Sequence, residues 1–184
     1  IVDGGQKLIR VRDDGAGIAK QELQLALSRH ATSKIRSLRD LESVGSMGFR
    51  GEALAALAAV ADLTLTSRHR DAGNASQINA ATPETIEPAA GAPGTRIEVL
   101  DLFAHTPARR KFLKSQGTET AHCLDAFRRL ALGHPNIAFT AFVDNRRVEQ
   151  FKPADWTTRA LAVMGDDFGS RHHSIEKTGA LTLR

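Results

Sequence analysis

The feature that most restricts the fold of this chain is the spacing of its hydrophobic residues, which changes repeatedly between the period of a β-strand and that of an α-helix. Short stretches with the pattern of β-strands are Lys7–Arg12, Leu63–Ser67, Arg96–Leu102, Ile137–Val143 and Val148–Phe151. Helical spacing of apolar residues occurs over Gln21–His30, Ala53–Ala61, Thr118–Leu132 and Trp156–Met164. Because strands and helices are mixed and hairpins come late, this order predicts an α+β fold. We expect a two-layer sandwich of helices on a mixed, mostly antiparallel sheet.

The composition excludes several classes of protein. The 184 residues include 25 Lys and Arg against 21 Asp and Glu, and the net charge of +4 permits contact with phosphates without demanding it. Aromatic residues are only 5% of the chain, so we do not expect a base-stacking platform for single strands. No apolar run approaches the roughly 18 residues of a membrane helix. The single cysteine, Cys123, excludes a disulfide framework and fits a reducing cytoplasm.

A first candidate site begins where the first strand pattern ends, at 13–17 (Asp-Asp-Gly-Ala-Gly). A carboxylate at a strand end can accept a hydrogen bond from an exocyclic amine, and glycines directly after it let a flat ring approach the backbone. The alternative is an ordinary Asp-Gly turn between a strand and a helix. The spacing is not the dinucleotide-binding fingerprint, because Lys20 stands where that fingerprint has a third glycine.

A second candidate is the glycine-rich stretch Gly45–Glu52, which leads directly into the alanine-rich helical pattern. Successive backbone N–H groups of such a loop, together with the positive end of the helix dipole, can bind phosphates. The three glycines do not have the spacing of a Walker A loop, and no Gly-Lys-Ser or Gly-Lys-Thr follows them. The alternative is a helix entry that needs a flexible backbone.

Two further segments are polar or basic. Arg29–Lys34 carries hydroxyls and an ammonium that could meet phosphate oxygens, or it is a polar link between helices. Asp101–Leu113 places a basic turn after a strand, and such a turn could contact a DNA backbone. The alternative for this turn is a solvated charged face whose apolar residues, Phe103, Phe112 and Leu113, pack inward.

Taken in order, these segments resemble the MutL family of DNA mismatch repair proteins. The strings that carry the resemblance are RDDGAGI, RHATSK, GFRGEAL and DLFAHTPARRKFL, with Gly94-Thr95 before a strand. GFRGEAL and the last string are highly specific to that family. The resemblance is clear from Lys7 to Phe151 and continues faintly to Arg184.

The resemblance implies a nucleotide site of the GHKL or Bergerat type, which type II topoisomerases, heat-shock chaperones and sensor histidine kinases share. At the base end of this site, Asp13 would bind the adenine amine with Thr95 beside it. Gly15 and Gly17 would make room for the base and the ribose.

The phosphate end of the implied site comes from two other segments. The lid over the phosphates would include Thr32, Ser33 and Lys34. Backbone N–H groups would reach the phosphates from Gly48, Phe49, Arg50 and Gly51. Apart from the nucleotide site, Arg109 and Arg110 are candidates for contact with DNA.

The resemblance also implies that part of the catalytic apparatus lies elsewhere. The family's first motif lies upstream of Ile1, and it supplies the glutamate that activates water and the asparagine that holds Mg²⁺. We therefore expect no catalytic residue and no metal ligand within this chain. Residues 1–153 would be the ATP-binding domain, and residues 154–184 the beginning of a second α/β domain. We expect the parent protein to be an ATPase and this piece to hydrolyse ATP poorly.

For the parent, the resemblance implies a bacterial, cytoplasmic, DNA-associated homodimer without a membrane anchor. Its ATP-driven dimerisation would link a MutS-like mismatch recognition protein to a downstream nuclease and helicase. Two other functions remain open at this point. One is the ATPase domain of a sister family, such as a type II topoisomerase, and the other is a non-catalytic DNA-binding or scaffold module.

Overall fold

The computed structural model describes residues 1–28 and 52–171, and the chain forms two compact units, Ile1–Thr120 and Ala121–Arg184. The predicted division after residue 153 stays a prediction. The elements of the first unit are η1 (Asp3–Gly5), β1 (Leu8–Arg12), η2 (Lys20–Glu22), α1 (Leu23–Leu27), α3 (Ala53–Ala58), β2 (Asp62–Arg68), β3 (Ala75–Asn79), β4 (Ile86–Ala89), β5 (Gly94–Leu100) and α4 (Pro107–Arg110). Then follow α5 (Gln116–Gly133), β6 (Phe139–Val143), β7 (Arg146–Phe151), α6 (Trp156–Met164) and α7 (Asp166–Arg171).

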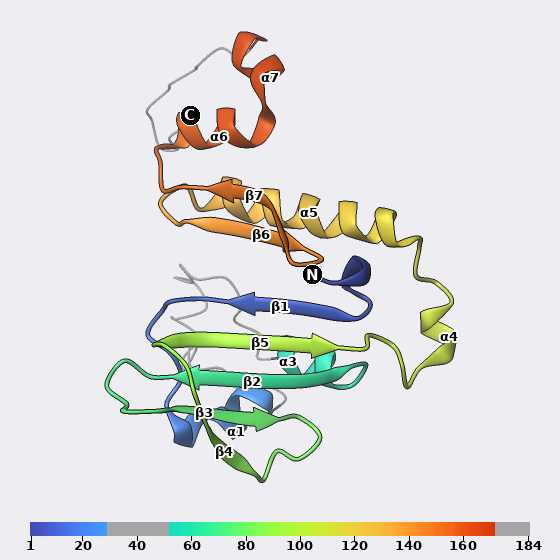
Figure 1. Ribbon diagram of the computed structural model, residues 1–184, viewed down its shortest axis with the longest axis vertical. Coiled ribbons are helices and arrows are strands. Elements are labelled where there is room, and N and C mark those ends of the chain that lie inside the picture. Colours follow the sequence, from blue (N-terminus) through green and yellow to red (C-terminus); the bar gives the residue numbers. More distant parts are fainter. Residues whose placement is uncertain (29–51, 172–184) are drawn as a thin grey trace, which may run out of the picture. The chain divides into compact units, whose positions relative to one another are not determined.

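The first unit is built on a five-stranded sheet in the order β1-β5-β2-β3-β4 (Figure 1). All four strand pairs in this sheet are antiparallel. The polar stretch between β2 and β5 contains the edge hairpin β3–β4, so the sheet ends on two short strands. Helices α1 and α3 lie on one face of the sheet (Figure 1). The predicted α+β fold, with helices on a mostly antiparallel sheet, is confirmed.

The face of the sheet that the helices cover carries the hydrophobic core. Side chains alternate between the two faces of a strand, so two apolar rows run across the neighbouring strands β1, β5 and β2 on this face. These rows are Ile9–Val99–Leu63 and Val11–Ile97–Leu65. Leu23 of α1 is fully buried among them, and Leu54 and Leu57 of α3 pack against the same cluster. Each leucine that is fully buried contributes about 1.5–3 kcal/mol to folding.

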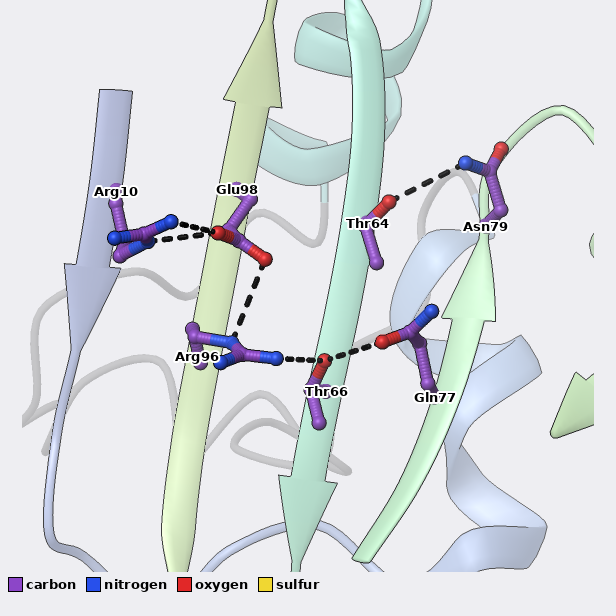
Figure 2. A network of polar contacts seen from close by, with 7 residues as sticks. All are labelled: Arg10, Thr64, Thr66, Gln77, Asn79, Arg96 and Glu98. Carbon is purple, nitrogen blue, oxygen red and sulfur yellow. Dashed lines mark hydrogen bonds and ion pairs between the residues drawn. The ribbon is translucent and has the colours of Figure 1, made fainter. Parts of the chain in front are cut away.

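The opposite face of the sheet is polar, because the alternate residues of the same strands carry charges, hydroxyls and amides (Figure 2). Arg10 Nε donates to Glu98 Oε1 at 2.7 Å, and Arg96 Nε lies 3.4 Å from Glu98 Oε2. Arg96 Nη2 donates to Thr66 Oγ1 at 3.4 Å, and the Thr66 hydroxyl donates to Gln77 Oε1 at 3.1 Å. These contacts join neighbouring strands across the outer face, and each is worth at most about 1 kcal/mol.

The second unit consists of an antiparallel hairpin, β6–β7, packed with helical segments. Phe127 of α5 meets Phe139 edge-on and stacks on Phe151, with ring centroids 5.9 Å apart in both pairs. Helix α6 begins at Trp156 and ends at Met164, as its spacing predicts. None of the helices in the described ranges combines the length and the apolar character that a membrane span requires.

A buried arginine holds the second unit together. Arg159 of α6 is 1% exposed, and its guanidinium lies over the rings of Phe139 and Phe151 at 5.7 and 5.6 Å. Its two terminal nitrogens donate hydrogen bonds of 2.6 to 3.4 Å to the carbonyl oxygens of Ala131, His134, Pro135, Ile137 and Lys152. The guanidinium therefore connects the end of α5, the following loop and the residue after β7 to α6.

Candidate functional site

The two apolar rows of the sheet continue into a third row that is polar. Beyond Val11–Ile97–Leu65, the same alternation places Asp13, Thr95 and Ser67 next to one another at the ends of β1, β5 and β2. The Asp13 N–H donates to the Thr95 carbonyl at 2.9 Å, and Thr95 pairs with Ser67 in the ladder. The structure thus brings together Asp13 and Thr95, which lie 82 positions apart in the sequence, as the family resemblance implies.

The Asp13 carboxylate is exposed and is held through one of its two oxygens. Oδ1 accepts hydrogen bonds from the N–H of Gly15 at 2.9 Å and from the N–H of Thr95 at 3.3 Å. In the described part of the chain, no hydrogen bond to Oδ2 accompanies these two. A carboxylate oriented in this way by the backbone can accept a hydrogen bond from a ligand amine at Oδ2 without rearranging.

Ser67 organises the site, and nothing in the sequence pattern singled it out. Its buried hydroxyl accepts from the N–H of Ile18 at 2.8 Å, lies 3.0 Å from the Gly94 carbonyl and 3.0 Å from Thr95 Oγ1. A hydroxyl has one proton, so all three contacts are hydrogen bonds when Ser67 donates to Gly94 and Thr95 donates to Ser67. In that arrangement the lone pairs of Thr95 Oγ1 remain available to a ligand.

Two glycines let backbone segments meet at the site. Gly17 has φ +72°, and a Cβ placed on it would lie 2.0 Å from the Arg68 carbonyl oxygen. Gly94 has φ +118°, and its Cβ would lie 2.2 Å from the Asp13 carbonyl oxygen. Both positions need glycine, because an L side chain is strained at these φ values and would also clash with backbone. Gly17 therefore serves the packing of the turn on the end of β2.

Gly15 differs from Gly17 in both respects. It has no positive φ, and the only described group within 4 Å of an added Cβ is the Asp13 carboxyl, whose Oδ1 would be 2.9 Å away. A side chain here would therefore displace the carboxylate rather than the backbone. No other described residue would lie within 4 Å of that Cβ, which fits the approach of a flat ring to the backbone at this residue.

The predicted phosphate end of the site falls outside the described residues. That part comprises the lid residues Thr32, Ser33 and Lys34 and the loop residues Gly48, Phe49, Arg50 and Gly51. The assignment of these seven residues stays a prediction.

The predicted DNA residues, Arg109 and Arg110, are exposed on α4. The inward packing considered for this segment is wrong for Phe112, whose side chain is 80% exposed. Phe103 and Leu113 are half-buried. The segment is thus anchored by two of its three large apolar residues and presents the third to solvent.

A cavity of about 450 Å³ opens at the other ends of β1, β5 and β2, away from Asp13. Its charged and titratable lining residues are Asp3, Asp62, Asp101, Lys7, His105 and Arg110. Three carboxylates face Lys7 and Arg110 there, so the cavity offers no favourable field to a triphosphate. The polar row around Asp13 remains the better nucleotide site. Within the described ranges, no three His, Cys, Asp or Glu side chains gather as a metal-binding group.

Comparisons with known proteins show the family of the chain. The sequence profile of the family described as "Histidine kinase-, DNA gyrase B-, and HSP90-like ATPase" matches residues 2–96, which include the whole polar row. The chain is 50% identical over 183 residues to the DNA mismatch repair protein MutL of Neisseria meningitidis serogroup A, covering 98% of this chain and 28% of that protein. It is 44% identical over 185 residues to MutL of Herminiimonas arsenicoxydans, covering 98% and 30%.

A solved structure matches as well. The Aquifex aeolicus MutL ATPase domain complexed with ADP is 30% identical, with a TM-score of 0.67 over 89% of this chain and 58% of that chain. The sheet, its covering helices and the polar row define a nucleotide-binding unit of the histidine kinase-, DNA gyrase B- and HSP90-like ATPase class. Within this class, the chain belongs to the MutL family. It spans about 28% of the length of the Neisseria relative.

Proposed function

We propose that this chain is the ATP-binding part of a MutL-type DNA mismatch repair protein. The observation that carries the proposal is the Asp13 carboxylate. The N–H groups of Gly15 and Thr95 orient it through Oδ1, and no described residue donates a hydrogen bond to Oδ2. An adenine amine is a donor of the kind that Oδ2 would accept. The Aquifex MutL domain with ADP bound supports a nucleotide as the ligand.

The lid and the glycine-rich loop would complete the site at the phosphates. Thr32, Ser33 and Lys34 would close over them, and backbone N–H groups of 48–51 would donate to their oxygens. The Mg²⁺ ligand and the general base would come from the longer protein, so ATP hydrolysis is a property that we assign to the parent.

For the longer protein we propose an ATP-driven switch in mismatch repair. ATP binding would order the lid and favour a homodimer, and hydrolysis would release it. The partners would be DNA, a MutS-like mismatch recognition protein, a nuclease and a helicase, in the bacterial cytoplasm. The names of the curated relatives support this role. The same relatives do not favour a type II topoisomerase, and the oriented carboxylate does not favour a non-catalytic scaffold.

Equilibrium binding of labelled ATP to the purified chain, beside an Asp13→Asn variant, tests the proposal. The side-chain carbonyl of the asparagine can still accept from the two N–H groups. Its NH₂ group replaces Oδ2, so a hydrogen-bond donor would face the adenine amine, which is also a donor. We expect the affinity for ATP to fall roughly 10- to 150-fold, the worth of a hydrogen bond to a charged group, with the fold retained.

The matched control is Asp14→Asn, which makes the same change of charge one residue further along. Asp14 is exposed and takes no part in the contacts between Asp13, Gly15 and Thr95. We expect the control to bind ATP as the parent chain does. An equal loss of ATP affinity in the two variants would show that only the overall electrostatic field matters, and it would remove the assignment of Asp13.

A further inference from the structure

An exposed aromatic ring lies in the most basic turn of the first unit. Residues 106–114 read TPARRKFLK, with four basic side chains and no acidic one. Phe112 is 80% exposed. The four basic residues, all exposed, are Arg109, Arg110, Lys111 and Lys114. In the part of the chain that the structure describes, no ion pair neutralises any of the four.

The exposure of this ring belongs to a folded turn. The N–H groups of Arg109 and Arg110 donate to the Thr106 carbonyl at 2.9 and 3.1 Å. Phe112 donates to the Arg109 carbonyl at 3.0 Å, and Leu113 donates to the Arg110 carbonyl at 3.2 Å. The turn follows β5 and contains α4 (Figure 1). Its hydrogen bonds and its half-buried Leu113 fix the backbone that presents Phe112.

We propose that this turn binds single-stranded DNA, with phosphates on the four basic side chains and the Phe112 ring stacked on an unpaired base. Every base has a π-face, but in a duplex that face is covered by neighbouring base pairs. A ring among cations that form no ion pair with the described residues complements both parts of a single strand, the anionic backbone and the open base. The inference rests on the proposed function only for the choice of DNA as the polymer.

The same features do not fit two other kinds of partner. An interfacial membrane helix needs a long apolar face, whereas α4 has four residues and the turn exposes a single ring. The core of a protein interface is poor in lysine, whereas lysines flank the ring on both sides, at 111 and 114. The scarcity of aromatic residues still excludes an extended stacking platform. One ring is enough for one base.

The experiment measures DNA affinity by fluorescence anisotropy in the full-length protein that contains these residues. The probes are a labelled oligothymidylate of about 30 nucleotides, long enough for several site sizes, and a duplex of the same length. For Phe112→Ala we expect the affinity for the single strand to fall roughly five- to 150-fold. The affinity for the duplex and the salt dependence stay unchanged. Phe112→Trp retains binding.

The charge on the turn is tested separately. An Arg109→Ala/Arg110→Ala variant weakens binding to both probes. The slope of log affinity against log salt becomes shallower by about 0.7 for each phosphate of the single strand that the variant no longer neutralises. The control is Arg146→Ala/Arg147→Ala, which removes two exposed arginines of β7 in the second unit. We expect the control to change neither affinity nor slope.

Three results would overturn the inference. In the first, Phe112→Ala lowers the unfolding temperature and leaves single-strand affinity unchanged. That result would mean that the ring packs against the rest of the protein. In the second, it changes the oligomeric state instead of DNA binding. In the third, it weakens binding to both probes equally.

ATP binding by Phe112→Ala stays normal if the two sites are separate. Equal loss of ATP binding in Asp14→Asn and Asp13→Asn would remove the assignment of Asp13 and would not bear on single-strand binding by this turn.

Discussion

Two charged side chains, one in each unit, are held in opposite ways. In the first unit the Asp13 carboxylate is exposed, and backbone N–H groups bind one of its two oxygens. In the second unit the Arg159 guanidinium is buried, and five carbonyl oxygens bind its terminal nitrogens. A charge that the backbone orients but leaves half open can bind a ligand. A charge whose donors are used up inside the protein can only stabilise the fold.

The difference predicts that mutations will separate the two roles. Changes at the carboxylate should alter ATP binding and leave folding nearly intact. Changes at the guanidinium should alter folding, whatever the ligand.

The largest effect that we expect is from Arg159→Met. Removing the guanidinium leaves buried carbonyl groups without donors and should lower the free energy of unfolding of the second unit by about 3–5 kcal/mol. The chain has a single tryptophan, Trp156 in α6, so its fluorescence during denaturation reports on this unit. Arg129→Met is the control in the same unit, because the ion pair of Arg129 with Asp125 is exposed on both sides and is worth about 0–1 kcal/mol. Equal losses would contradict the role given to Arg159.

A smaller loss of stability is expected from Gly17→Ala. The alanine would need a left-handed backbone, and its Cβ would meet the Arg68 carbonyl oxygen at 2.0 Å. We expect a cost of about 2–4 kcal/mol from strain and overpacking, measured by circular dichroism during denaturation. Gly15→Ala is the matched change, and it should leave stability within about 0.5 kcal/mol while weakening ATP binding, because its Cβ meets only the Asp13 carboxyl. The opposite ranking would mean that the turn does not dock on β2 as described.

The smallest expected effect concerns Asp155, the N-cap of α6. Its carboxylate accepts hydrogen bonds from the N–H and the hydroxyl of Thr158 at 2.9 and 2.7 Å, and the backbone bond foremost lowers the pKa of Asp155. The unfolded chain keeps the ordinary pKa of about 3.9. The contribution of this cap is therefore complete above about pH 4 and is lost as the pH falls through the lower folded pKa.

Unfolding of the second unit, followed through Trp156 between neutral and acid pH, measures this effect. Asp155→Asn is the control, since asparagine also caps helices but does not titrate in this range. The parent chain should lose slightly more stability than the variant below pH 4, given the ordinary aspartate pKa of about 3.9. Identical pH profiles would show that the cap contributes nothing through its charge.

Much of the fold could be read from the chain because it depends on near neighbours. The alternation in β1, β2 and β5 assigns Ile9, Leu63 and Val99 to one face, and the structure places them in one row. The helical spacing of Trp156–Met164 predicts both ends of α6. The polar end of the site was predictable in part, since Asp13 follows a strand and precedes glycines. The pairing of Asp13 with Thr95 came from the family resemblance alone.

Three features depended on distant neighbours and could not be read from local pattern. Ser67 ends an ordinary strand pattern, and it gains its role from Ile18, which lies 49 positions away. Arg159 is a lone charge in an apolar helix, and its carbonyl partners lie up to 28 positions away. Phe112 is a large apolar residue of the kind that is usually buried, yet the turn exposes it to solvent.

The sequence by itself therefore determined the kinds of elements, the faces of the strands and the family, because side-chain period and motif are local properties. Only the tertiary structure decided which charge is open and which is buried. That outcome depends on how many hydrogen-bond partners distant segments bring to each charged group, and no spacing along the chain specifies that number.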